Sequence, residues 1–146
     1  MIRITSISQL RYETIQYDET WAIVRSLKKP IKGVKQVADL SPSNNLFYSY
    51  LNWKKQGIWN AETFETKYVP TFIKELKANP NVQPLLAELV DKAKAGKNIC
   101  LLCFCPDETL CHRSIIAGLL QGVDGVKVIT NTNNDYSKYM KMYFDC

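Results

Sequence analysis

Residues 98–114 read NICLLCFCPDETLCHRS, and the fold prediction rests on them. Residues 98–105 form a nearly continuous apolar run, which is typical of a central strand covered on both faces of a sheet. A helix pattern then opens near Cys111, and aliphatic residues recur at helical spacing as far as Gly122. The segment therefore predicts a buried strand, a short loop and a helix.

Alternating strands and helices are predicted on both sides of this segment. The predicted strands, rich in β-branched or aromatic residues, are residues 2–7, 21–25 and 126–130. The predicted helices, which carry apolar residues at helical spacing, are residues 43–57, 60–76, 84–96 and 136–143. Pro70 lies inside the second of these helices, where we expect a kink or a break. The alternation favours a single α/β domain over residues 1–146 with a mainly parallel sheet.

The composition is that of an ordinary globular protein. Hydrophobic residues make up 46% of the 146 residues and charged residues 23%, which excludes a disordered, collagen-like or coiled-coil chain. The longest wholly apolar run is residues 99–105, far shorter than the roughly 20 residues of a membrane helix. The first residues lack the apolar core of a secretory signal. We therefore expect a soluble, cytoplasmic protein with no membrane partner.

The net positive charge of the chain mildly favours anionic partners. The net charge is +5, and residues 25–35 hold five basic residues and no acidic one. This basic segment is open to two interpretations. Either it faces a phosphate backbone, or it is a solvated, positively charged loop.

The cysteines are the most informative residues. Four of the five lie between Cys100 and Cys111, and an odd number argues against a disulfide framework. Cys103 and Cys105 would share one face at the end of the predicted strand, because residues two apart in a strand point to the same side. Ligands of open α/β sheets bind at the carboxyl ends of strands, beside helix N-termini. The sequence therefore predicts a site there.

The residue types at this position suit phosphate recognition and thiol chemistry. Cys111 would lie beside a helix N-terminus and next to His112 and Arg113. These neighbours would favour the thiolate form of Cys111 over the thiol, as nucleophilic or redox chemistry requires. His112, the only histidine, would act as acid, base or donor. The planar guanidinium of Arg113 matches a phosphate. A packed, inert role of these residues in the core is the alternative reading.

Zinc is a further alternative. Cys103, Cys105, Cys111 and His112 match the four ligands of a structural zinc site in number. Their spacing is unusual, because Cys111 and His112 are adjacent and would diverge by about 100 degrees on a helix. Our first interpretation is therefore a site without a metal or a cofactor. A third interpretation is thiol redox chemistry, in which Cys103, Cys105 and Cys111 would form disulfides among themselves.

The residues described so far resemble a known family. Residues 101–120, with L-L-C-x-C, a five-residue gap, C-H-R and an aliphatic helix, resemble the hallmark of the domain of unknown function 488 (DUF488) family. Residues 22–26 (AIVRS) resemble the V-R-S strand end of that family, and residues 40–43 (LSPS) resemble an L-A-P-S segment of one branch. Many members carry an acidic residue just before the V-R-S arginine and another at the position of Cys105. This chain carries neither.

The resemblance implies a three-layer, Rossmann-like α/β domain, and it assigns no activity. Carried over by position, the residues implied at the site are Arg25, Ser41, Ser43, Cys103, Cys111, His112 and Arg113. We expect a phosphate-bearing ligand, a nucleotide or nucleic acid, bound by Arg25, Ser41, Ser43, Cys103, Cys105 and Arg113, with Cys111 and His112 as the catalytic residues if the protein is an enzyme. The alternative is a thiol- or zinc-stabilised interaction module without catalytic activity.

Overall fold

The computed structural model describes residues 1–144 of the 146-residue chain. Its sheet consists of β1 (Ile2–Ser6), β2 (Glu19–Ala22), β3 (Val34–Gln36), β4 (Ile99–Cys103) and β5 (Val128–Ile129). The strand order is β3-β2-β4-β1-β5, and every neighbouring pair is parallel. The prediction of a parallel sheet is therefore confirmed. The predicted domain, residues 1–146, extends two residues beyond the described part.

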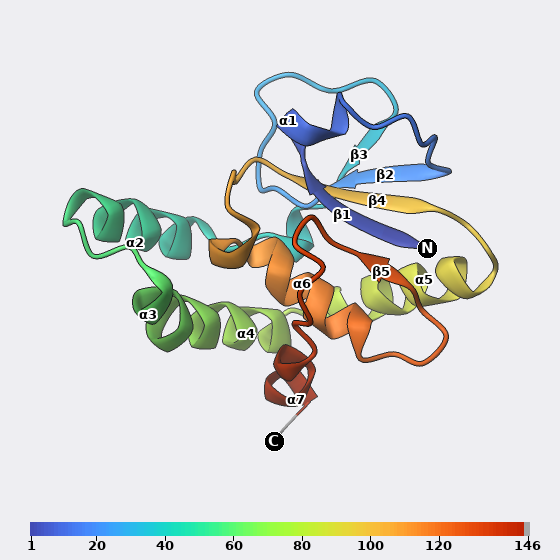
Figure 1. The fold of residues 1–146 in the computed structure, drawn as a ribbon. Coiled ribbons are helices and arrows are strands. Elements are labelled where there is room, and N and C mark those ends of the chain that lie inside the picture. Colours follow the sequence, from blue (N-terminus) through green and yellow to red (C-terminus); the bar gives the residue numbers. More distant parts are fainter. Residues whose placement is uncertain (145–146) are drawn as a thin grey trace.

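The helices complete a three-layer, Rossmann-like arrangement. They are α1 (Ile7–Leu10), α2 (Asn44–Lys55), α3 (Ala61–Thr63), α4 (Val69–Ala78), α5 (Val82–Lys94), α6 (His112–Gln121) and α7 (Lys138–Phe144). Figure 1 shows α1 and its loops on one side of the sheet, and α4, α5 and α6 on the other. None of the helices within residues 1–144 is both long and apolar enough to cross a bilayer.

Strand β4 is the centre of the fold, as its composition predicts. All five of its residues are buried. Ile4 of β1 and Trp21 of β2 are both in register with Leu101, one on each side of β4. A strand with hydrogen-bonded neighbours at both edges and packed layers on both faces has no position for a polar side chain, which explains the apolar run.

Strand β3 was missed by the sequence prediction. Its three residues, Val34–Gln36, are half-buried or exposed, and it lies at the edge of the sheet. It also overlaps the end of the basic segment, where no alternation of apolar residues marks a strand. Strand β2 lies at Glu19–Ala22, where residues 21–25 were predicted, because the last backbone hydrogen bond to β4 is that of Ile23 N–H to the Leu102 carbonyl oxygen. The short helix α1 was also missed.

The helix around Pro70 continues without a loop. Ala61–Thr63 is followed by a π-helical turn, Phe64–Tyr68, and then directly by α4. Pro70 has no backbone N–H, and its ring would clash with the carbonyl of residue 66 in a regular α-helix. The predicted kink or break thus takes the form of a wider turn, which is a known way for a helix to absorb such a residue.

The topology creates a crevice at the carboxyl ends of β2 and β4. These two strands are neighbours, but the chain runs from β2 to β3 at one edge of the sheet and from β4 to β5 at the other. Ligand sites of open parallel sheets lie where successive connections diverge in this way. Residues 24–26 after β2, and Phe104, Cys105 and Leu110 after β4, border this crevice.

Candidate functional site

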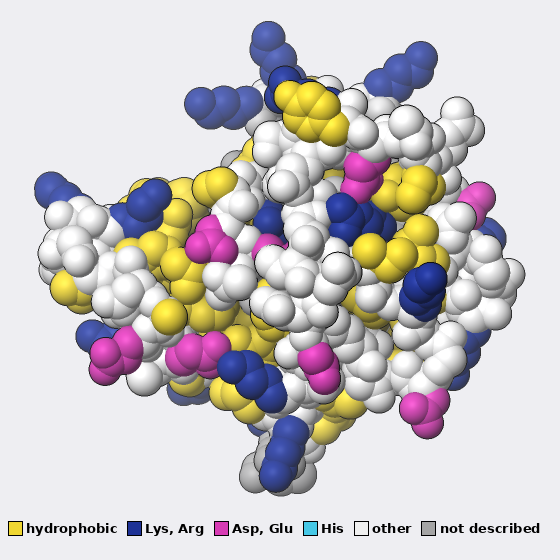
Figure 2. Space-filling view, viewed as in Figure 1, with side chains coloured by type: hydrophobic (Ala, Val, Ile, Leu, Met, Phe, Trp, Pro, Cys, Tyr) yellow, Lys and Arg dark blue, Asp and Glu magenta, His cyan; other side chains and the backbone are white. Residues whose placement is uncertain are grey.

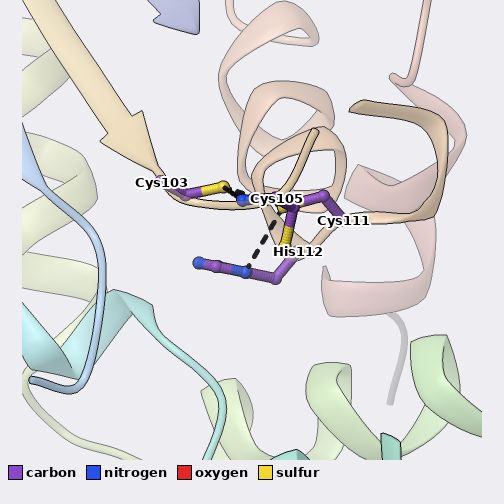
Figure 3. Close-up of side chains that lie close together, drawn as sticks. All are labelled: Cys103, Cys105, Cys111 and His112. Atoms are coloured by element: carbon purple, nitrogen blue, oxygen red, sulfur yellow. Dashed lines mark hydrogen bonds between the residues drawn. The ribbon is translucent and has the colours of Figure 1, made fainter. Parts of the chain in front are cut away.

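Three thiols and the imidazole converge at the end of β4. Cys103 is the last residue of β4, Cys105 lies in the loop that follows, Cys111 is the N-cap of α6, and His112 is the first residue of α6. Their ligand atoms, the three Sγ atoms and one imidazole nitrogen, all lie within 4.8 Å of one another. Figure 3 shows the four side chains pointing toward one another. We call these four residues the Cys/His cluster.

The backbone around Cys111 explains why the cluster can form. Cys111 has an extended conformation, φ −128° and ψ 146°, because it caps α6 from outside the helix. The divergence of about 100 degrees between successive helical residues therefore does not apply to Cys111 and His112. The argument from spacing against a metal site was wrong for this reason. Cys105 also lies beyond the end of the strand, and its backbone N–H donates to Cys103 Sγ at 3.4 Å.

Hydrogen bonds fix the imidazole of His112. Its Nε2 lies 2.7 Å from the main-chain oxygen of Ile23, which can only accept, so Nε2 carries the hydrogen. In the neutral form of the ring, Nδ1 is then the unprotonated nitrogen, and it lies 3.6 Å from Cys111 Sγ. The Sγ atoms of Cys103 and Cys111 are 2.9 Å apart. The lone pair of Nδ1 therefore faces the thiols.

The three thiols of the cluster differ in their readiness to ionise. Hydrogen bonds from Cys105 and Cys111, aided by the positive charge of Arg113, hold the pKa of Cys103 well below its usual range. The bond to Cys103 and burial raise the pKa of Cys105 to about 12. Burial raises the pKa of Cys111, and its own hydrogen bond to Cys103 raises it further. Negative charge in the cluster therefore settles first on Cys103.

Arg113 is buried against the cluster and does not lie on the surface. Its side chain is 1% exposed, and Nη1 donates to the Cys105 carbonyl oxygen at 2.5 Å and to Cys103 Sγ at 3.4 Å. Its Nε is buried without a hydrogen-bond partner. Arg25, the other predicted phosphate ligand, is instead exposed.

A pocket of about 360 Å³ opens beside the cluster, in the crevice between β2 and β4. Cys105 and His112 form part of its wall, and so do Arg25, from the segment after β2, and Ser41, from the segment after β3. Five aromatic side chains also line it: Phe47, Tyr48, Tyr50, Tyr68 and Phe104. Figure 2 shows the hydrophobic surface between α2 and the centre of this face. We call this cavity the aromatic pocket.

The sequence prediction did not include the aromatic residues in the site. Phe104 alone carried a signal, because it stands between Cys103 and Cys105 at a strand end. Phe47 and Tyr48 lie on α2, more than fifty residues before the cluster, and helical spacing does not separate pocket residues from core residues. Cys103, Cys111 and Arg113 were predicted at the site but do not line the pocket.

Arg25 and the two predicted serines have separate roles. Arg25 Nε donates to the Pro42 carbonyl oxygen at 2.8 Å, and Nη2 reaches two further carbonyl oxygens of the same loop. Ser41 Oγ donates to the Ala38 carbonyl oxygen at 2.5 Å. Ser43 caps α2 by accepting from Leu46 N–H, and it lies outside the aromatic pocket.

The lysines of the basic segment do not line the aromatic pocket. Lys28, Lys29 and Lys32 are exposed, and the Nζ of Lys35 lies 4.8 Å from the ring centre of Trp21. The solvated-loop interpretation fits these positions. Any contribution of the segment to the pocket is therefore a long-range electrostatic one.

Comparison with known proteins identifies the family. A protein-family model described as the active DUF488-N3 subclade matches residues 4–123. This range includes every predicted site residue and the whole Cys/His cluster. Searches of curated proteins and of solved structures gave no significant match. The chain therefore belongs to the DUF488 family, in the branch described as its active N3 subclade.

Proposed function

We propose that the protein binds a nucleotide, free or as a unit of single-stranded nucleic acid, in the aromatic pocket. The observation that carries the proposal is one cavity, at the carboxyl ends of β2 and β4, that combines five aromatic side chains with Arg25. A nucleotide has the same two parts, a planar base and an anionic phosphate. Crevices at this position of parallel sheets bind such ligands in many folds.

The aromatic side chains supply a surface for a base. Phe47, Tyr48 and Phe104 are 47%, 66% and 56% exposed, although side chains of this size are normally packed away from water. Exposed apolar groups around a cavity mark binding sites. Stacking of a base on one such ring contributes roughly 1–3 kcal/mol and depends little on base identity.

Arg25 supplies a fixed cation for the phosphate. Its Nε and Nη2 are held by carbonyl oxygens of residues 38–42, which orient the guanidinium. Nη1 makes no hydrogen bond to any of residues 1–144, so it is free to donate to a ligand. Charge-assisted bonds from a guanidinium to a phosphate are among the strong hydrogen bonds of proteins.

Cys105 and His112 are the groups of the cluster that a bound ligand can touch. Both line the pocket, whereas Cys111 is 1% exposed and does not. The catalytic pair predicted from the sequence was Cys111 and His112. We now propose Cys105 in place of Cys111 at the point of contact, because a thiol sealed in the core cannot reach a ligand.

Calorimetric titration of the reduced protein tests this function. AMP, ADP and a single-stranded oligonucleotide serve as ligands, at low and at high salt. We expect at least one to bind, and we expect Arg25→Ala to weaken it about tenfold, or roughly 1.4 kcal/mol. Tighter binding of the oligonucleotide that falls steeply with salt would identify nucleic acid as the ligand.

Lys29→Ala is the matched control, since Lys29 is also exposed and basic but does not line the pocket. It should bind as the unchanged protein does. The proposal fails if none of the three ligands binds, or if Arg25→Ala and Lys29→Ala have the same affinity.

A further inference from the structure

The Cys/His cluster has the donor set of a closed zinc site. Three thiolates and one imidazole form one of the common structural zinc sets, and soft sulfur ligands favour zinc over magnesium or calcium. Here these donors come from β4, the following loop and the start of α6, and their ligand atoms lie within 4.8 Å of one another. We propose that Cys103, Cys105, Cys111 and His112 bind one Zn²⁺ ion.

The distances in the cluster are compatible with tetrahedral coordination after small side-chain rotations. Zinc–sulfur bonds of about 2.3 Å place two sulfur ligands about 3.8 Å apart, and a disulfide requires about 2.05 Å. The Sγ atoms of Cys103 and Cys111 are 2.9 Å apart, and Cys111 Sγ lies 3.6 Å from His112 Nδ1. A disulfide between the first two would also leave the convergence of Cys105 and His112 unexplained.

The outer hydrogen bond of His112 is the one that zinc ligands typically have. A metal-bound histidine almost always donates its other ring N–H to a carbonyl or carboxylate oxygen, which fixes the tautomer and orients the ring. His112 Nε2 donates to the Ile23 main-chain oxygen at 2.7 Å, so the lone pair of Nδ1 is directed at the sulfurs. The imidazole is therefore already oriented to coordinate.

The charge of Arg113 also fits a metal–thiolate centre. Zn²⁺ with three thiolates carries a net charge of −1, and Arg113 is 1% exposed with Nη1 donating to Cys103 Sγ. Arg113 forms no ion pair within residues 1–144. Glu108 is buried nearby, but its carboxylate accepts hydrogen bonds from Asn131 N–H and from the hydroxyls of Thr132 and Tyr136. An anionic centre would compensate the buried guanidinium, which is otherwise costly.

Zinc analysis of the full chain, purified reduced from zinc-supplemented medium, tests the inference. We expect about one zinc per chain, and close to none in Cys105→Ser, in which a half-buried ligand is replaced without emptying the core. Cys103→Ser should lose zinc as well. Cys100→Ser is the matched control, because Cys100 is a buried free thiol of the same strand but lies outside the cluster.

A cobalt-substituted sample gives a second, independent measurement. Tetrahedral cobalt with thiolate ligands has visible and charge-transfer bands, and we expect these in the unchanged protein and in Cys100→Ser. They should weaken in Cys105→Ser. The inference is overturned if the reduced protein takes up neither zinc nor cobalt, or if Cys105→Ser retains as much metal as Cys100→Ser. Nucleotide titration is a separate measurement, so failure of the pocket proposal leaves this result untouched.

Discussion

His112 Nε2 donates a hydrogen bond of 2.7 Å to the main-chain oxygen of Ile23, and this contact joins the start of α6 to the chain just after β2. Because Ile23 directly precedes Val24 and Arg25, which line the pocket, the bond links the Cys/His cluster to the segment that carries Arg25. It also leaves only Nδ1 free on the ring. His112 is thus an oriented ligand or hydrogen-bond partner of the thiols.

Replacing Phe104 tests the aromatic pocket without disturbing the core. Phe104 is 56% exposed and lines the pocket, so Phe104→Ala should weaken nucleotide binding by roughly 1–3 kcal/mol, about one stacked base. The melting temperature of the Phe104→Ala protein should stay close to that of the unchanged protein. Phe144, 57% exposed on α7, lies outside the pocket, and Phe144→Ala should bind normally. Equal affinities for the two variants would exclude Phe104 from the site.

Ser43 is predicted here to stabilise α2 and not to bind ligand. Its Oγ accepts from Leu46 N–H at 3.0 Å, and it also donates to the Glu75 carboxylate. Ser43→Ala should lower the free energy of unfolding by about 1–2 kcal/mol, as loss of an N-cap does, with unchanged nucleotide affinity. Urea denaturation measures the first and calorimetry the second. Ser49→Ala, inside α2, should change stability by less than about 0.5 kcal/mol. A Ser43→Ala protein with full stability would contradict the capping role.

Gly118 lets α6 and the chain around Tyr136 approach closely. A Cβ at Gly118 would overlap the Tyr136 carbonyl oxygen, which is backbone and cannot rotate away. Gly118→Ala should therefore lower the free energy of unfolding by about 1–3 kcal/mol or more. A Cβ at Gly122 meets only the flexible side chain of Met140, so Gly122→Ala should cost less. Chemical denaturation measures the free energy of unfolding of both variants. A larger loss for Gly122→Ala than for Gly118→Ala would contradict this prediction.

Cys100 gives a prediction about alkaline pH. Burial raises the pKa of its thiol from 9.0 to about 12. Between these values the unfolded chain loses the proton and the native chain keeps it, so stability falls as pH rises above about 9. One such group contributes a slope of up to about 1.4 kcal/mol per pH unit.

Removing the Cys100 thiol should flatten this dependence. In Cys100→Ala, the free energy of unfolding should fall less steeply between about pH 9 and about pH 11 than in the unchanged protein. Urea denaturation across this range, under reducing conditions, measures both slopes. Other groups that ionise in this range are common to both proteins and cancel in the comparison. Parallel curves would show that the Cys100 thiol is not shielded in the native state.

Much of the fold could be predicted because its central strand has a strong sequence signal. The apolar run of residues 98–105 marks β4, and the helical spacing after Cys111 marks α6, so both elements were found. Strand β3 could not be found in this way. It is held by backbone pairing with β2 at the sheet edge, and such pairing leaves no periodic pattern in exposed residues.

The structure brings together the four Cys/His residues that are clustered in the sequence, and their role in a site stays a prediction. Clustering of Cys103, Cys105, Cys111 and His112 in sequence was enough to indicate a common location. The spacing argument failed at Cys111, because a residue that caps a helix has an extended backbone and does not follow helical geometry. The burial of Arg113 and the aromatic wall depend on contacts between distant segments, which one sequence does not reveal.

Chemical-shift mapping by two-dimensional NMR tests the central claim, nucleotide binding in the aromatic pocket, most directly. AMP titrated into the ¹⁵N-labelled, reduced protein should shift the amide signals of residues that line the pocket, among them Arg25, Phe47, Tyr48, Phe104 and Cys105. Signals of Arg3 on β1 and of β5, which do not line the aromatic pocket, should not move. The absence of shifts at the pocket, or shifts confined to Arg3 and β5, would contradict the account.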